Sequence, residues 1–288
     1  MPERPTGSTD RFARGSAVLA EIAGPQGPAL LNSLAGIAPD LARLTIEFGY
    51  GDIYTRPGLT LPQRQIVNVA ALTALGHAAP QLRFHIDGAL NVGVGAAQVV
   101  ETIVHMSVYA GFPAALNGLA VARQAFEARP DLGWRPEEGG PRPQEPEETA
   151  RERHARGLAT LREVVGPLGE ATVAAVAETS PELARHIVEF AFGDVYARPS
   201  LDLRTRSLVT VAACTTLGTA GPQLRVHLHA FLDLGGTREE VVELMTHLAG
   251  YAGFPAALNG VAAAREVFAE RDARGERDAG PAGGATAQ

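Results

Sequence analysis

Two pairs of histidines are the residues of this chain best suited to proton transfer. The 288-residue sequence is an internal duplication with an offset of 142 residues, and only four of its eight histidines recur at the matching position: His85/His227 and His105/His247. A histidine titrates near neutral pH, so it can donate or accept a proton. We therefore predict His85 and His227 as general acid/base groups. The alternative is a core histidine bonded to a backbone carbonyl.

The second pair of histidines lies in a polar stripe. Glu101 precedes His105 by four residues and Tyr109 follows it by four, so the three side chains share one helix face. The second copy repeats the pattern with Glu243, His247 and Tyr251. Functionally, each glutamate would orient its histidine as a supporting group. The alternative is a satisfied polar stripe at a contact between helices or subunits.

Retained arginines are candidates for holding a substrate carboxylate. Arg64 and Arg206 each begin a helix that soon becomes apolar, and a guanidinium can bind a carboxylate through two hydrogen bonds. The structural alternative is an ion pair with a retained carboxylate, Glu47 or Asp52. The same two interpretations apply to Arg56 and Arg198, each of which precedes a proline.

Metal, thiol and nucleotide chemistry are not indicated. His85 and His105 lack a close ligand pair such as HxxxH, so a zinc site would require three separate helices to converge. Cys214 is the single cysteine, and a lone thiol cannot form an internal disulfide. The glycine-containing segments match neither a P-loop nor GxGxxG. We expect no metal and no organic cofactor.

The elements that would position these residues are helices. Apolar spacing and Pro/Gly boundaries predict helices over 11–23, 28–34, 62–75, 80–90, 97–110 and 113–128, one more beginning at Pro39, and a turn at 51–57. The string YAGFPAALNG occurs at Tyr109–Gly118 and again at Tyr251–Gly260, and its small residues indicate close helix packing. No segment alternates with period two, so the predicted fold class is all-α.

The duplication predicts two domains. The first copy covers 11–129, a Pro/Glu/Gly-rich linker covers 130–152, the second copy covers 153–271, and 272–288 form a disordered tail. Each copy is long enough for its own core. The net charge of −7 argues against a nucleic-acid partner, and no apolar run is long enough for a membrane span. We expect a cytoplasmic protein.

Several motifs resemble one known family. The pattern F-G-D-x-Y-x-R-P through R matches Phe192 to Arg206, and the first copy departs from it only at Tyr50. P-x-L-x-x-H, E-x(3)-H and Y-x-G-F-P-A-A follow in both copies. Together they resemble the carboxymuconolactone decarboxylase family over nearly all of both copies. The resemblance implies an all-helical fold of the alkylhydroperoxidase D type, which usually assembles into trimers or hexamers.

The resemblance also implies a reaction class. The peroxidase branch of the family uses a CxxC pair before the histidine, and this chain has no thiol pair. The other branch resembles 4-carboxymuconolactone decarboxylase, which needs no cofactor. We therefore expect a decarboxylase of a small unsaturated lactone carboxylic acid, in which His85 and His227 move the proton.

Two other functions remain possible interpretations of the sequence, and one oligomeric state is predicted. A cyclase or isomerase of a specialised metabolite would use the same histidines without loss of CO2. A non-catalytic binding or assembly protein would use them only as structural hydrogen-bonding groups. Because single-domain relatives form rings of domains, we expect three tandem chains to form a homotrimer.

Overall fold

The computed structural model describes residues 10–24, 34, 36–135 and 148–276, and within these ranges the regular elements are helices without a strand. The first copy contains α1 (Arg11–Ala23), α3 (Pro39–Leu44), η2 (Thr45–Ile53), α4 (Leu61–Leu75), α5 (Ala79–Asn91), α6 (Ala96–Tyr109), α7 (Gly111–Glu127) and η3 (Pro130–Leu132). The second copy contains α8 (Ala150–Thr179), α9 (Pro181–His186), η5 (Ile187–Tyr196), α10 (Leu203–Leu217), α11 (Gly221–Asp233), α12 (Arg238–Leu248) and α13 (Phe254–Ala273). The all-α prediction is confirmed.

Local signals in the sequence place most helix ends. The Thr60 side chain caps α4 by accepting from the Gln63 amide, and Gly76 ends the helix in the left-handed conformation with φ of 73°. The helix predicted over 11–23 is α1, and those over 62–75, 80–90, 97–110 and 113–128 are α4 to α7 within two residues. The helix predicted over 28–34 lies almost entirely outside the described residues.

The turn predicted at 51–57 is partly wrong, because Gly51 lies inside the π-helix η2. The wider helix is closed by a hydrogen bond from the Tyr54 amide to the Gly49 carbonyl. Helix α1 lies backbone to backbone against it: a Cβ on Gly15 would be 2.1 Å from the Ile46 oxygen, and one on Gly51 would be 2.5 Å from the Arg11 oxygen. Segments of π-helix are rare and are frequently found at functional sites.

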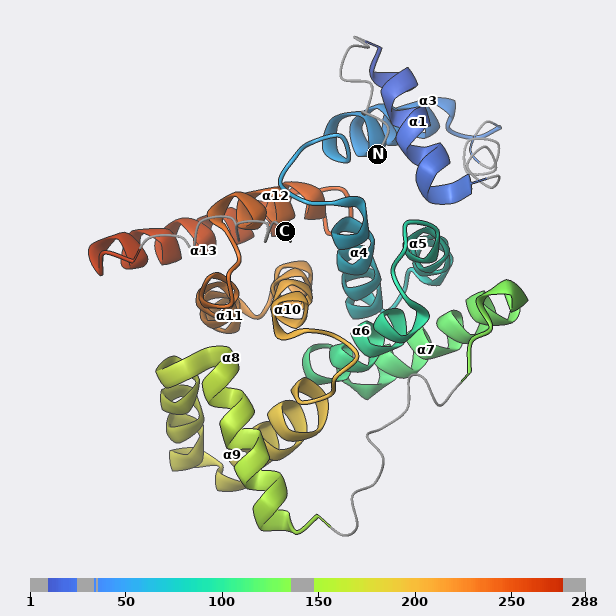
Figure 1. The fold of residues 1–288 in the computed structure, drawn as a ribbon. Coiled ribbons are helices and arrows are strands. Elements are labelled where there is room, and N and C mark those ends of the chain that lie inside the picture. Colours follow the sequence, from blue (N-terminus) through green and yellow to red (C-terminus); the bar gives the residue numbers. More distant parts are fainter. Residues whose placement is uncertain (1–9, 25–33, 35, 136–147, 277–288) are drawn as a thin grey trace, which may run out of the picture.

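The two copies do not have separate cores. Helices α4 and α10 lie side by side in the middle of the molecule (Figure 1). One hydrophobic cluster combines Val69 of the first copy with Val209 and Ala213 of the second, and another combines Val67 with Leu244. Almost every residue of α4 from Arg64 to Ala74 is buried. A helix that is apolar on all sides must be covered on all sides, and here the other copy supplies the missing cover.

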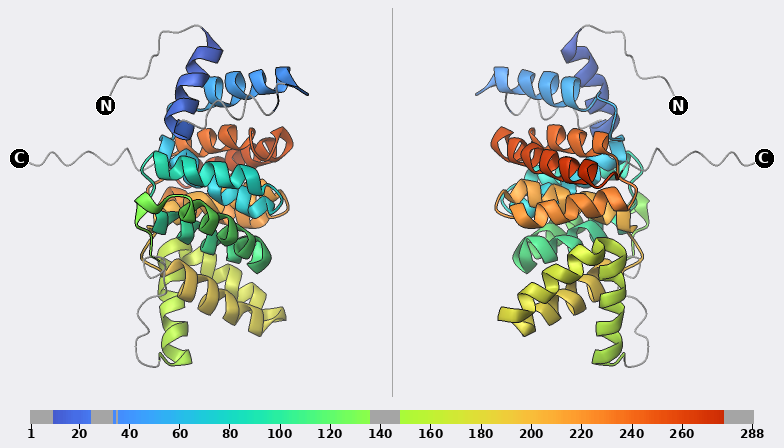
Figure 2. Two further views of the ribbon diagram at one scale, coloured as in Figure 1. Left: turned by 90° about the vertical axis from the view of Figure 1, so that its right-hand side faces the viewer. Right: turned by 90° about the vertical axis from the view of Figure 1, so that its left-hand side faces the viewer.

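The repeated small residues bring helices close together, as expected. A Cβ on Gly118 would be 2.8 Å from Ile103 Cγ2, so α7 lies tightly against α6. A Cβ on Gly260 would be 2.3 Å from Met245 Sδ at the matching α13–α12 contact. The helices stack into an elongated molecule with α1 and η2 at one end and α8 and α9 at the other (Figure 2).

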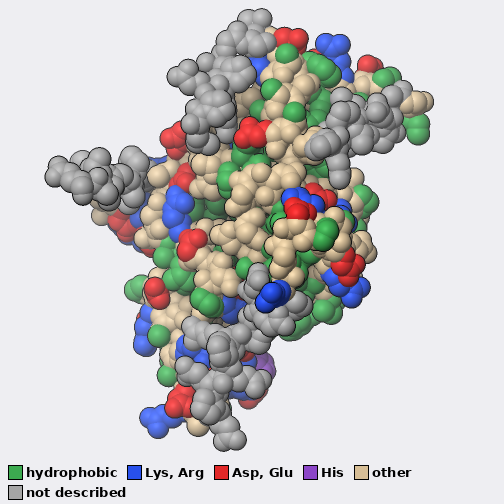
Figure 3. Space-filling model, turned by 45° about the vertical axis from the view of Figure 1, so that its right-hand side comes forward, with side chains coloured by type: hydrophobic (Ala, Val, Ile, Leu, Met, Phe, Trp, Pro, Cys, Tyr) green, Lys and Arg blue, Asp and Glu red, His purple; other side chains and the backbone are tan. Residues whose placement is uncertain are grey.

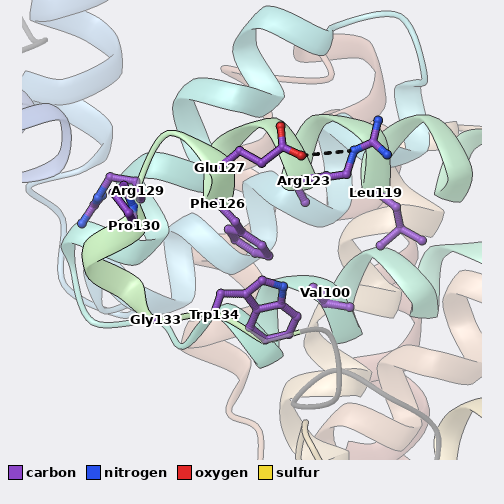
Figure 4. Close-up of a pocket in the computed structure, with 10 residues that line it drawn as sticks. Val100, Leu119, Arg123, Phe126, Glu127, Arg129, Pro130, Gly133 and Trp134 are labelled. Carbon is purple, nitrogen blue, oxygen red and sulfur yellow. Dashed lines mark ion pairs between the residues drawn. The ribbon is translucent and has the colours of Figure 1, made fainter.

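The surface is mixed in character. Acidic and basic side chains are interspersed on the face shown in Figure 3. Trp134 lies over Phe126 with ring centroids 5.1 Å apart, and the two rings line a groove of about 550 Å³ beside α6 and α7 (Figure 4). No helix in the described part of the chain has the length and apolarity to cross a bilayer.

Candidate active site

The candidate site is a cavity of about 740 Å³ lined by both copies. Its wall includes Tyr54, which follows η2, and His85 of α5 from the first copy, and His247 of α12 and Tyr251 from the second. A cavity of this volume is in the range that accommodates small organic ligands. The site therefore depends on the interleaving of the copies.

His85 is held in one orientation inside this cavity wall. It is 4% exposed, and its Nδ1 lies 2.8 Å from Gln65 Oε1. Because an amide oxygen only accepts, Nδ1 carries the proton and the lone pair of the neutral ring is on Nε2. Burial lowers the pKa of His85 to about 3. At neutral pH the ring is therefore uncharged and can accept a proton.

The second copy contributes His247 through Asn68. His247 Nε2 donates to Asn68 Oδ1 at 2.8 Å, while Arg64 Nη1 donates to His247 Nδ1 at 3.3 Å. Burial and, next, the neighbouring Arg64 charge hold the pKa of His247 well below its usual value. The Asn68 amide nitrogen also donates to Tyr54 Oη at 2.6 Å. These bonds fix the tautomer of His247.

Two tyrosines close the polar network. The hydroxyl groups of Tyr54 and Tyr251 are 2.6 Å apart, and the Tyr251 ring meets His85 edge-on with centroids 5.1 Å apart. Burial raises the pKa of Tyr54 to about 12, so its hydroxyl stays protonated. Tyr251, predicted as a supporting group, comes from the second copy and lies beside His85 of the first.

A second site repeats this frame with the copies exchanged. His227 of α11 lies 3.2 Å from the hydroxyl of Tyr109, which is 2.6 Å from the Tyr196 hydroxyl. His105 Nε2 donates to Thr210 Oγ1 at 2.8 Å. Burial lowers the pKa of His227 to about 4 and that of His105 well below its usual value.

The arginines predicted to bind substrate form ion pairs between the copies. Arg64 is fully buried and donates to Glu243 Oε1 at 2.7 Å and to the Arg56 carbonyl at 2.9 Å. Arg206 donates to Glu101 Oε1 at 2.8 Å, also without exposure. The structural alternative is therefore the one observed, although the carboxylate comes from the opposite copy rather than from Glu47 or Asp52.

The remaining arginines and glutamates complete the same clusters. Arg56 Nε donates to Glu243 at 2.8 Å, and Arg198 Nε donates to Glu101 at 2.9 Å. The expectation that Glu101 orients His105 is wrong, because its carboxylate is occupied by two arginines of the other copy, and Glu243 is placed in the same way. The alternative of a polar stripe at a helix contact describes both residues.

Sequence reasoning missed Gln65 and Asn68, which hold the two histidines. Both are fully buried on α4. The available signal was a pair of amide side chains inside an apolar helix. The search for residues retained in both copies discarded them, because the second copy has Ser207 and Thr210 at these positions.

Neither a three-ligand metal cluster nor a reactive thiol is found among the described residues. No group of three His, Cys, Asp or Glu side chains there is arranged to hold a metal ion. Burial raises the pKa of the Cys214 thiol to about 12, so it is protonated at neutral pH and a poor nucleophile.

Comparisons with known proteins point to one family. A family model described as carboxymuconolactone decarboxylase matches residues 39–124 and again 181–266. A 4-carboxymuconolactone decarboxylase of Acinetobacter baylyi is 36% identical over 128 residues, which cover 44% of this chain and 92% of that protein. A nitrosuccinic acid decarboxylase of Metarhizium robertsii is 30% identical over 91 residues, 31% of this chain and 62% of that protein.

Proposed function

Because this chain belongs to the carboxymuconolactone decarboxylase family, we propose that it removes CO2 from a small unsaturated lactone carboxylic acid of the 4-carboxymuconolactone type. Two similar proteins are named as decarboxylases of small organic acids. The observation that carries the proposal is His85: a buried, neutral imidazole, oriented by Gln65, in the wall of a cavity large enough for such an acid.

The proposed reaction breaks the bond between the ring carbon and the carboxylate. CO2 leaves, and the bonding electron pair enters the conjugated lactone. One proton, taken from solvent, then replaces CO2 on carbon. Neutral His85 accepts this proton at Nε2 as negative charge develops beside it, because a neighbouring anion favours the imidazolium form, and passes it to the carbon. No redox partner is required.

The substrate carboxylate needs a binding group other than Arg64, which is engaged with Glu243. The first turn of α5 faces the cavity through Ala78, Pro80 and Gln81, and Ala78 does not cap the helix with its side chain. Amides at a helix N-terminus favour an anion. His77 also lines this region. We assign the substrate carboxylate to this end of the cavity.

The first prediction concerns His85→Asn, measured by CO2 release from 4-carboxymuconolactone. Asparagine keeps a donor near the Nδ1 position, so the bond to Gln65 survives, but it has no basic nitrogen. We expect turnover to fall by about 100-fold or more, the usual contribution of a general acid/base. His186→Asn, an exposed position on α9, is the matched control.

The outcomes separate the hypotheses. A folded His85→Asn protein with near-wild-type turnover would show that His85 is not the proton carrier. Formation of a rearranged acid without CO2 would identify an isomerase. Absence of any reaction in the wild-type protein would overturn this substrate class.

A further inference from the structure

The two histidine sites share one frame but differ at three linked positions. The His85 site has Gln65, Asn68 and Gly88, and the His227 site has Ser207, Thr210 and Ala230. All six positions are buried. The differences are therefore not the free variation of exposed surface positions. They alter the hydrogen bonds of the two histidines.

Gly88 makes room for the glutamine that orients His85. A Cβ at Gly88 would be 2.7 Å from Ile22 Cγ2 of α1, and it would be 3.1 Å from Gln65 Oε1, the atom that accepts from His85 Nδ1. Both separations are tighter than ordinary van der Waals contact, so an alanine would press on Ile22 and on the Gln65 amide. The second copy has the methyl group of Ala230 at the matching position, together with the short Ser207.

Without the glutamine, His227 is bonded through its other nitrogen. Among the described residues, His227 Nδ1 and Ser207 Oγ are buried without a hydrogen-bond partner. His227 Nε2 instead lies 3.2 Å from the Tyr109 hydroxyl. The nitrogen that bears the lone pair in His85 is thus engaged with a tyrosine of the opposite copy in His227.

The link to the second histidine differs as well. In the His85 site, Asn68 accepts from His247 at 2.8 Å, and its amide nitrogen donates to Tyr54 at 2.6 Å; that nitrogen also lies 3.3 Å from the protonated Nδ1 of His85, to which it cannot donate. In the His227 site, the Thr210 hydroxyl bonds His105, Tyr196 and the Arg206 carbonyl. Thr210 thus bonds the opposite copy's histidine and the tyrosine, as Asn68 does, but it donates its single hydroxyl proton to the Arg206 carbonyl.

From these differences we infer that the His85 site alone performs proton transfer, and that the His227 site has become a structural contact between the copies. The inference rests on the proposed function, which it narrows to one of two sites. Gln65 and Gly88 act as positioning residues for His85. One chain thus carries one reactive site, built from both copies.

Turnover of 4-carboxymuconolactone tests the inference. His85→Asn should lose about 100-fold or more, and His227→Gln, which keeps a donor near Nε2, should keep the turnover of the wild type. Tyr109→Phe removes the hydrogen-bond partner of His227. It replaces His227→Gln in this test if that variant does not fold, and it should also keep the turnover of the wild type. The inference would be overturned if His85→Asn and His227→Gln lost turnover to a comparable extent, for example if each variant lost half of the wild-type activity.

A second measurement separates this inference from the reaction class. Diethyl pyrocarbonate reacts with the free lone pair of an imidazole, and peptide mass spectrometry locates the adduct. We expect His85 to be modified and His227 to be protected by Tyr109, with Tyr109→Phe exposing His227. If the wild-type protein releases no CO2, the proposed reaction class is wrong, and the modification pattern still tests whether the two sites differ. Equal modification of His85 and His227 would refute the difference between the sites.

Discussion

At the scale of single residues, the environment of His85 decides what it can do. A histidine in water titrates near neutral pH, but burial lowers the pKa of His85 to about 3. The ring is therefore uncharged at neutral pH, and Gln65 determines which nitrogen is free. The proposed proton transfer depends on one amide side chain that has no counterpart in the second copy.

Replacing Gln65 tests this positioning role. Gln65→Glu places a carboxylate against Nδ1, which favours the protonated ring, so the acid limb of the kcat/KM profile should move from near the His85 pKa of about 3 to higher pH. Gln65→Ser should lower kcat more than it changes KM, because it leaves Nδ1 without its acceptor.

Gln124→Glu is the control for added charge, since Gln124 is exposed on α7. It should leave the pH profile unchanged. An identical profile in Gln65→Glu would mean that Gln65 does not set the protonation of His85.

At the scale of elements, α4 and α12 are joined by a buried ion pair. The side chains of Arg64 and Glu243 are 0% and 4% exposed and lie 2.7 Å apart. Glu101 and Arg206 make the matching pair between α6 and α10. Removing one partner of a buried pair leaves the other charge without compensation in an apolar environment. These pairs therefore act as cross-links between the copies.

Glu243→Ala should lower the free energy of unfolding by roughly 3–5 kcal/mol in urea denaturation. The control is Glu127→Ala, whose partner Arg123 is 75% exposed and 3.8 Å away. It should cost less than about 1 kcal/mol, as exposed pairs do. Equal effects of the two substitutions would contradict the role given to the buried pair.

At the scale of the whole molecule, four of the buried histidines couple folding to pH. The pKa values of His85, His227, His105 and His247 all lie below the ordinary value of 6.5, because burial disfavours the charged ring. The unfolded chain therefore binds more protons than the folded one below that pH. Stability from this source is complete above the unfolded pKa and is lost as pH falls.

Thermal melting between pH 7 and pH 5 should show this loss. We expect Tm to fall with pH, and to fall less in His85→Asn, which removes one of the four titrations. His186→Asn, exposed on α9, should retain the wild-type difference. A Tm that rises towards pH 5 would have the wrong sign for buried neutral histidines.

We propose that the chain assembles as a homotrimer. Exposed apolar side chains on α7 and α13, Phe112 and Leu116 in one copy and Phe254 and Leu258 in the other, are 59–65% exposed and are candidates for the contacts. Light scattering should give about 90 kDa, three times the 30.1 kDa chain. Leu116→Glu and Leu258→Glu together should reduce this mass. A stable monomer of the wild-type protein would refute the trimer.

The sequence alone determined the duplication, the all-α fold and most helix ends, and it singled out His85 as a candidate. These features follow from signals that are local in the chain: apolar spacing, capping residues and a motif repeated at a constant offset. Retention between the copies identified the arginines and glutamates, but it could not show that they pair with each other.

Only the tertiary structure decided which residues meet. Arg56 and Glu243 are 187 positions apart, and Arg198 and Glu101 are 97 apart. No local pattern links such residues. They come together because α4 and α10 must be buried on all sides, which forces the copies to interleave. The same interleaving places Tyr251 beside His85. The tertiary structure also shows that Gln65 and Gly88, two positions at which the copies differ, lie next to each other at His85.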